Sequence, residues 1–395
     1  MMKWVAIAAL ALLIVGVVAF PRLGRESAVS AQPAGAASAG NGQMRNYFIA
    51  ADEVVWDYAP SGRNQVTGEP FTNPFERLVA VPGKGVIGSK YKKTIYREYT
   101  DATFTTLKPR RSDWEHLGFI GPLIRAEVGD TIKVVFKNNG KHPFSMHPHG
   151  VFYEKASEGA QYSDGTTMNR GVTAPGATHN YEWQVPERAG PTEHETSSAM
   201  WMYHSHVDEN LDVNAGLIGP MVITRRGAAR PDGSPKDVDR EFVIGFIEMD
   251  ENLSWHFDES IAMAVEPKSV RKVENFAEPD YLVNLKESLN GFIYGHLPSP
   301  TMKKGERVRW YLFGSTNFEV HAPQWHVNTV IANHMRTDVV GLLPMGMLVA
   351  DMVPDAAGTW LFHCHTGPHL LAGMVGKYIV QDSSTASPTA TGGLN

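Results

Sequence analysis

Short apolar runs separated by turn residues fill most of the chain after residue 43. Runs such as YFIAADEVVW, TIKVVFKN, EFVIGFIEM and RVRWYLFG combine β-branched, aromatic and aliphatic residues, which favour strands. Glycine, proline and aspartate gather between the runs, as in VPGKG, APGA and RPDGSP, and these residues favour turns. Many short strands with frequent turns predict all-β domains of the sandwich or barrel type.

The N-terminal segment has a different pattern. Lys3 precedes a continuous apolar run from Trp4 to Phe20, and Pro21 and a stretch rich in alanine, glycine and serine follow. This is the pattern of an export segment. The run is long for a signal-peptide core and short for a membrane span, so cleavage after Ala31 and retention as an anchor both fit it. In either case we expect the rest of the chain in the periplasm or outside the cell.

An internal repeat divides the β region into two copies. The matching segments follow one another in the same order, which predicts two domains of one kind. The pairs are VGDTIKVVFKN with KGERVRWYLFG, FSMHPHG with HAPQWHV, WMYHSHV with WLFHCHT, and AGLIGPMVI with AGMVGKYIV. We therefore expect an export segment and linker over 1–44, a first domain over 45–225, a linker over 226–240, a second domain over 241–381 and a disordered tail over 382–395.

Charge and cysteine content narrow the classes of function. The net charge of −6 over 395 residues, without long runs of lysine or arginine, offers no surface for nucleic acid. Cys364 is the only cysteine in the sequence, so no intramolecular disulfide can form. A lone thiol in an exported protein is a liability unless it is buried, reactive or bound to a metal. The neighbouring His363 and His365 favour a metal.

The segment HCHTGPHLLAGM, which ends at Met374, carries the strongest chemical signal. Residues two apart on a strand share one face, and the residue between them points to the other face. We therefore expect His363 and His365 to face one site and Cys364 another. Cys364, His369, a further histidine and Met374 supply the thiolate, two imidazoles and weak thioether of a blue-copper centre. The alternative is a buried free cysteine among incidental histidines.

Two other segments carry histidines two residues apart, and a third strand segment carries two histidines that lie five residues apart. Any one such pair is more often a surface or hydrogen-bonded pair than a metal site, but their matching places in the two copies favour metal binding. We expect them to meet where the two kinds of domain face each other. The pairs are His147 with His149, His204 with His206, and His321 with His326.

In these residues the chain resembles the multicopper oxidases, and among them the branch of ceruloplasmin and hephaestin. The likeness also includes YFIAADEVVWDYAP, LGFIGPLIRAEVGD, AGLIGPMVI and MDENLSWHF, and covers nearly everything after the export segment. The resemblance implies two cupredoxin-like Greek-key domains and copper cofactors. It also implies that a small reductant, either a metal ion or a phenol, is oxidised while dioxygen is reduced to water.

The resemblance assigns ligands to each copper. The type 1 copper would be held by His321, Cys364, His369 and Met374. The coupled type 3 pair would be held by His149, His204, His206, His326, His363 and His365. The type 2 copper would be bound by His147. Electrons would enter at His369 and pass through Cys364 to His363 and His365.

Three positions depart from the repeat or the family pattern. Phe144 and Ser205 stand at the places equivalent to His321 and Cys364, so we expect no blue copper in the first domain. A blue site in the second domain alone resembles the two-domain multicopper oxidases, which implies a homotrimer with clusters shared between chains. Gln324 stands where the family has a second type 2 ligand, and its amide is a weaker donor than imidazole. We therefore expect a type 2 site that is weakened or absent.

The reductant and the class of activity stay open. The segment EMDENLSWHFDES offers Glu248, Asp250, Glu251 and Asp258 to guide a cation such as Fe(II), although a solvated acidic turn explains it equally well. Pro368, where ceruloplasmin has an acidic residue, counts against iron, so Cu(I) and a phenol are alternatives. Two other classes are a non-enzymatic copper protein with an impaired type 2 site and a nitrite-reductase-like enzyme.

Overall fold

The computed structural model describes residues 42–273, 275, 277–315 and 319–382. The predicted export segment and the tail after residue 382 lie outside these residues. The described part contains nineteen β-strands, and its five α-helices have at most seven residues each. The prediction of an all-β fold is therefore confirmed.

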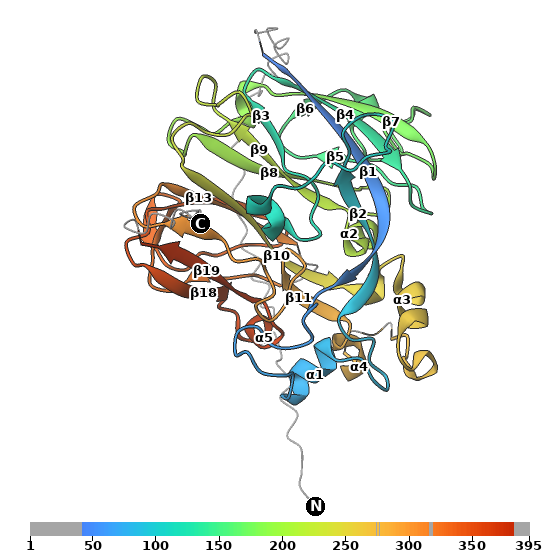
Figure 1. Ribbon diagram of the computed structural model, residues 1–395. Coiled ribbons are helices and arrows are strands. Elements are labelled where there is room, and N and C mark those ends of the chain that lie inside the picture. The colour runs from blue at the N-terminus through green and yellow to red at the C-terminus, as the bar shows by residue number, and fades with distance from the viewer. Residues whose placement is uncertain (1–41, 274, 276, 316–318, 383–395) are drawn as a thin grey trace, which may run out of the picture. The chain divides into compact units, whose positions relative to one another are not determined.

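Strands between residues 44 and 224 form two sheets, coloured blue to green in Figure 1. The strand order is β2-β1-β4-β7-β6 in one sheet and β3-β9-β8-β5 in the other. Buried and partly exposed residues alternate along β4, so one face of the sheet packs into a core. The bounds are β1 Met44–Asp57, β2 Lys90–Glu98, β3 Ile124–Glu127, β4 Thr131–Asn138, β5 His147–Pro148, β6 Phe152–Tyr153, β7 Thr178–Gln184, β8 Ser198–His204 and β9 Ile218–Thr224.

Strands between residues 240 and 381 form a corresponding pair of sheets. Their orders are β11-β10-β13-β17-β15-β16 and β12-β19-β18-β14. Strand β10 pairs antiparallel with β11 and parallel with β13, just as β1 pairs with β2 and β4. The likeness of the two halves in sequence thus extends to their sheets, while the domain boundaries stay a prediction. The bounds are β10 Arg240–Asp250, β11 Leu285–Leu289, β12 Thr301–Lys303, β13 Val308–Ser315, β14 Pro323–Trp325, β15 Val330–Ala332, β16 Met335–Thr337, β17 Met347–Met352, β18 Gly358–Cys364 and β19 Val375–Gln381.

Short helices connect the strands. In the described part of the chain, none is long and apolar enough to cross a membrane. The α-helices are α1 Pro74–Ala80, α2 Glu209–Ala215, α3 Phe257–Met263, α4 Pro279–Leu282 and α5 Gly367–Leu371. The 3-10 helices are η1 Ser112–Leu117, η2 Lys155–Ser157, η3 Glu187–Ala189, η4 Glu251–Leu253 and η5 Pro267–Ser269. Pro368 lies in the first turn of α5, where its missing N–H costs nothing.

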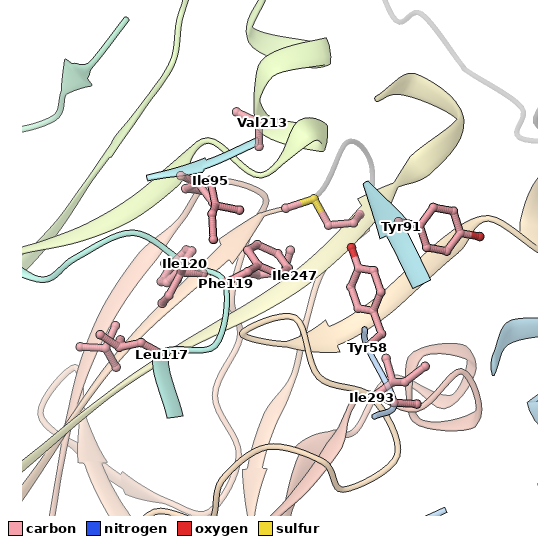
Figure 2. Close-up of a cluster of buried hydrophobic side chains, with 14 of the residues drawn as sticks. Tyr58, Tyr91, Ile95, Leu117, Phe119, Ile120, Val213, Ile247 and Ile293 are labelled. Carbon is pink, nitrogen blue, oxygen red and sulfur yellow. The ribbon is translucent and has the colours of Figure 1, made fainter. Parts of the chain in front are cut away.

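The two halves share a buried apolar cluster in addition to a core of their own. Figure 2 shows Ile95 and Phe119 of the first half in this cluster with Ile247 and Ile293 of the second. Burial of each such side chain stabilises the folded chain by about 2 kcal/mol relative to exposure. The cluster therefore couples the stability of the two halves.

A buried ion pair lies beside this cluster. Lys93 Nζ on β2 lies 2.7 Å from Glu251 Oε1 on η4, and both side chains are fully buried. The hydroxyl of Tyr58 also donates to Glu251 Oε1, at 2.5 Å. Burial lowers the pKa of Lys93 and raises that of Glu251, while their mutual attraction opposes both shifts. Each charge therefore depends on the other half of the chain for its partner.

Candidate metal centres

Three side chains of the second half converge at one buried point. Cys364 ends β18, His369 follows within α5, and His321 lies just before β14. The Nδ1 atoms of the two histidines lie 3.1 Å apart, and Cys364 Sγ lies 3.9 Å from that of His321 and 3.5 Å from that of His369. Met374 is also fully buried, and its carbonyl accepts the backbone N–H of Cys364 at 3.0 Å. The structure thus brings together three of the residues expected at a type 1 copper, and Met374 adjoins Cys364 through the backbone.

The chemistry of this group fits copper. Burial, followed by repulsion from His369, lowers the pKa of His321 to about 3, so its ring is neutral. Among the described residues, His321 Nε2 is buried without a hydrogen-bond partner, and the Nδ1 atoms that converge with Sγ are suitable ligands. The backbone N–H of Ala322 donates to Cys364 Sγ at 3.3 Å, which stabilises a thiolate. One thiolate and two neutral imidazoles suit copper better than a hard cation.

The equivalent place in the first half holds hydrogen bonds in place of ligands. Phe144 is fully buried there. Ser205 Oγ donates to Asp212 Oδ2 at 2.6 Å, and Trp255 Nε1 donates to Asp212 Oδ1 at 2.9 Å. The backbone N–H of Ser145 donates to Ser205 Oγ at 3.0 Å, as Ala322 does to the cysteine. The two places therefore correspond in backbone but not in chemistry.

Four histidines of the first half form a group on β5, β8 and the residues beside them. His147 pairs with His204 across the two strands, and the Nε2 atoms of His149 and His204 lie 3.1 Å apart. Ring centroids of His147 and His206 lie 5.1 Å apart. His204 Nδ1 lies 3.0 Å from the carbonyl of Ser205. A proton on that Nδ1 leaves the Nε2 lone pair to a metal.

The second half repeats this arrangement with three histidines. The Nε2 atoms of His326 and His363 lie 3.0 Å apart, and His363 Nδ1 lies 3.0 Å from the carbonyl of Cys364. The rings of His363 and His365 lie 5.8 Å apart. Two neutral imidazole nitrogens at this separation repel each other unless a proton or a cation lies between them. Both histidine groups therefore fit a metal.

The two histidine groups do not meet within one chain. Among the residues that the structure describes, ring contacts join histidines of the same group, and none joins the first group to the second. Each group also reaches the surface, since His149 and His326 are partly exposed and His365 is exposed. One chain therefore presents two separate half-sets of ligands.

Gln324 lies beside the second histidine group. It pairs with His363 across β14 and β18 and is partly exposed. Its Nε2 donates to Asp338 Oδ2 at 3.4 Å. Asp338 is a carboxylate that the sequence analysis missed, because no spacing rule connects it to the histidines. An oxygen donor thus lies next to the position where the family has a histidine.

Two acidic side chains, Glu248 and Glu287, lie close to His369. Glu248 on β10 is opposite Glu287 on β11, and their oxygens and a His369 nitrogen lie within 4.8 Å of one another. Both acids are 6% exposed, and within the part of the chain that the structure describes Glu287 Oε2 has no hydrogen-bond partner. Burial, followed by the charge of Glu248, raises the pKa of Glu287 well above its usual range. Glu319 Oε2 lies 3.3 Å from His369 Nε2.

Glu248 was expected from the sequence, but its partners Glu287 and Glu319 were not. The other three acids that were expected to guide a cation have different contacts. Asp250 accepts hydrogen bonds from the Tyr281 hydroxyl and from Asn252, Glu251 pairs with Lys93, and the exposed Asp258 pairs with Lys272. The expectation that these three acids guide a cation is therefore wrong for Glu251, whose side chain is fully buried, and is not supported for the other two.

Comparison with known proteins gives a consistent result. Two family models, both described as Multicopper oxidase, match residues 116–228 and 264–384, which together are more than half of the chain. The chain is 40% identical over 356 residues to Hephaestin of Rattus norvegicus, 42% over 345 residues to Ferroxidase HEPHL1 of Homo sapiens and 43% over 344 residues to Ceruloplasmin of Rattus norvegicus. These alignments cover 88%, 86% and 85% of this chain but 30%, 29% and 32% of the relatives. The chain thus spans about a third of the length of these relatives.

Solved structures show the same fold. The chain superposes on Multicopper Oxidase mgLAC with a TM-score of 0.53 at 18% identity, covering 88% of this chain and 89% of that one. Blue Copper Oxidase from Nitrosomonas europaea gives a TM-score of 0.53 at 16% identity, with 86% of each chain covered. The prediction of cupredoxin-like domains is confirmed.

Proposed function

Because the chain belongs to the multicopper oxidase family, whose cofactor is copper, we propose that it oxidises a reductant by one-electron steps and reduces dioxygen to water. The observation that carries this proposal is the position of Cys364. Its Sγ lies in the thiolate and imidazole group, while the backbone of β18 connects it directly to His363 in the half-set that contains His326. The chain itself therefore connects the two kinds of site.

The residues have distinct roles in this proposal. His321, Cys364, His369 and Met374 hold the type 1 copper, and the half-sets hold the other coppers through His147, His149, His204, His206, His326, His363 and His365. Bound copper supplies one-electron transfer at the first site and oxygen reduction at the second. Backbone hydrogen bonds fix the rings of His204 and His363 and the orientation of Cys364 Sγ, so the donor atoms are in place before the metal binds.

We propose a metal ion, and Fe(II) in particular, as the reductant. The buried Glu248 and Glu287 lie against His369, the type 1 ligand with a carboxylate on its outer side. Burial and the charge of Glu248 raise the pKa of Glu287, so without a cation this pair holds a proton, and a cation between the two side chains favours the form in which both are carboxylates. Carboxylates favour harder cations, whereas Cu(I) prefers sulfur ligands. A neutral phenol gains nothing from this pair.

We further propose that the half-sets complete each other between chains in a homotrimer, with the first half of one chain against the second half of the next. The separation of the half-sets within one chain supports this arrangement. Exposed apolar side chains lie within two residues of candidate ligands in the second half: Val320 is 53% exposed, Val327 56% and Leu371 66%. Burial of such side chains drives association.

We also propose that the protein acts outside the cytoplasm. The apolar run at the N-terminus supports export, with either a cleaved signal or a retained anchor. N-terminal sequencing of the mature protein separates the two outcomes, because a retained anchor begins at the first residues of the chain.

Oxygen uptake with Fe(II), Cu(I) and a phenol, together with copper content and visible absorption, tests the proposed activity. We expect a blue protein that consumes dioxygen fastest with Fe(II). A blue protein with one copper per chain and no oxygen uptake would support the alternative of a non-enzymatic copper protein. In that case the amide of Gln324 would have impaired the type 2 site. Reduction of nitrite in place of dioxygen would support the nitrite-reductase-like alternative.

A further inference from the structure

A cleft of about 550 Å³ lies in the first half, and none of its lining residues is a candidate metal ligand. The end of β2, the segment 107–111, η1 and the start of β3 form its walls. Five cationic side chains line it with a single acid, Glu98. The cations are Arg97, Lys108, Arg110, Arg111 and Arg125.

Four of these cations have carboxylate partners. Lys108 pairs with Glu98 at 2.8 Å and Arg111 pairs with Asp113 at 2.8 Å. Arg125 pairs with Glu241 through two bonds of 2.9 Å. Arg97 has the loosest pair, at 3.6 Å from Asp52.

Arg110 differs from the other four cations. Its NH1 donates to the carbonyl of Gly118 at 2.7 Å and its NH2 to that of Ile120 at 3.2 Å. Within the described residues, it is the one cation of the cleft without a carboxylate at ion-pair distance. Partial removal from water and the neighbouring Arg97 guanidinium lower its pKa, while Tyr203 and the Glu115 carboxylate oppose this shift. The hydrogen bonds to carbonyls hold the side chain in place without neutralising its charge.

The cleft also has apolar walls. Leu107, Pro109 and Leu123 line it beside the arginines. The ring of Trp114 already contacts two other side chains and is not counted as a ligand-binding wall. The Arg125 guanidinium lies 5.3 Å from its centroid, and the ring of His116 lies at the same distance. A guanidinium that has no carboxylate at ion-pair distance among the described residues, next to aliphatic side chains, suits an anion that has an apolar body.

We propose that this cleft binds a small organic carboxylate, aromatic or short-chain aliphatic, as a ligand distinct from the reductant. Its carboxylate lies between Arg110 and Arg97, where it relieves the repulsion of the two guanidiniums. A guanidinium binds a carboxylate through parallel hydrogen bonds. The body of the ligand lies against Leu107 and Leu123 and excludes water from the ion pair.

Calorimetric titration of the full-length protein with benzoate tests this proposal. Benzyl alcohol, of similar shape but uncharged, and inorganic phosphate, charged but without an apolar body, are the comparison probes. We expect benzoate to bind more tightly than either. We expect Arg110→Met to weaken benzoate binding about tenfold or more, as the loss of a charge-assisted contact does. Arg271→Gln removes an exposed, paired arginine outside the cleft and should leave the affinity unchanged.

The Arg110 substitution also removes donors to two carbonyls, so Arg97→Gln serves as a second variant whose folding does not depend on them. An affinity for benzoate that is unchanged in a folded Arg110→Met or in Arg97→Gln overturns the proposal. Equal binding of benzoate and benzyl alcohol overturns it as well, and so does tighter binding of phosphate. Weaker binding in both cleft variants, with normal binding in Arg271→Gln, supports it.

Discussion

Cys364 connects the two kinds of candidate site because its side chain and its backbone belong to different groups. Its Sγ converges with His321 and His369, and its carbonyl lies 3.0 Å from His363 Nδ1. The alternation of side chains along a strand makes this division predictable from sequence. The identity of the third partner was not predictable from spacing alone, since only the fold brings His321 next to Cys364.

Replacement of Cys364 by serine should abolish the blue absorption. A hydroxyl does not replace the thiolate that gives a type 1 copper its colour, and oxygen uptake should fall at least about 100-fold because the thiolate that joins the type 1 site to the backbone beside His363 is lost. Visible absorption and oxygen uptake measure both effects. Ser205→Ala, at the equivalent place in the first half, is the matched control and should leave both unchanged. A Cys364→Ser protein that stays blue would contradict the type 1 assignment.

Replacement of Glu287 by glutamine should slow the oxidation of Fe(II) but not the oxidation of a phenol. We expect kcat/KM for Fe(II) to fall about 10-fold or more because glutamine cannot ionise to give the second carboxylate beside Glu248, while oxidation of a phenol stays within about twofold. Asp258→Asn is the control, since Asp258 is exposed and paired with Lys272. Equal losses for both reductants would show that Glu287 only maintains the structure around His369.

Replacement of Gln324 by histidine should raise the copper content per chain and the rate of oxygen uptake. Imidazole is a stronger copper ligand than an amide, and the position lies beside His363. Metal analysis by mass spectrometry measures the first effect. No change in either quantity would indicate that Asp338 or water already completes the site.

At the scale of single elements, the strands followed from the sequence and the short helices did not. The runs around Tyr47, Thr131, Phe242 and Trp310 form β1, β4, β10 and β13, because β-branched and aromatic residues fit a pleated, half-buried surface. Helices of four to seven residues are too short to show a 3.6-residue period. Glu287 was missed for a related reason, since it meets Glu248 only through the register of β10 and β11.

His116 on η1 should make stability depend on pH. Its ring is 3% exposed, its Nδ1 lies 3.0 Å from the carbonyl of Asp113, and its Nε2 accepts the N–H of Val243 on β10 at 3.3 Å. Both contacts suit a neutral ring, and burial lowers the pKa of His116 from 6.5 to about 4. The unfolded chain therefore binds more protons between these values, so stability falls as pH drops through this window.

The loss attributable to His116 should be about 2 kcal/mol between pH 6.5 and pH 5. Urea unfolding at both pH values measures it as the difference between the wild type and His116→Gln, because the other histidines contribute equally to both proteins. The variant should lose less stability on acidification than the wild type. Parallel losses would mean that the ring is protonated in the folded chain at pH 5.

At the scale of the whole molecule, the two halves depend on each other through the shared cluster and the buried ion pair. Lys93→Met leaves the Glu251 carboxylate buried without its partner and should lower the free energy of unfolding by about 3 to 5 kcal/mol. The double variant Lys93→Met with Glu251→Leu should recover most of that loss, because no unpaired charge stays buried. Thermal unfolding measures both variants. A double variant that is less stable than the single one would contradict this account.

Complementation tests the proposed sharing of clusters between chains. One variant carries alanine in place of His149 and His204 and lacks the first half-set. The other carries alanine in place of His326 and His363 and lacks the second half-set. Each should be inactive alone, while co-expression should restore about a quarter of the wild-type oxygen uptake, the share of interfaces in a randomly mixed ring that join two intact half-sets. No activity after mixing, or a monomeric mass by light scattering, would overturn the shared cluster.

The separation of the two half-sets has a consequence for control in the cell. Under the proposed assembly, oxygen chemistry switches on only after chains have found one another, so activity rises more steeply than the amount of protein. Under the same proposal, a dilute single chain carries the complete type 1 group but lacks a complete site for the reduction of dioxygen. A single chain therefore cannot pass electrons to dioxygen. This would limit the formation of partly reduced oxygen species until assembly is complete.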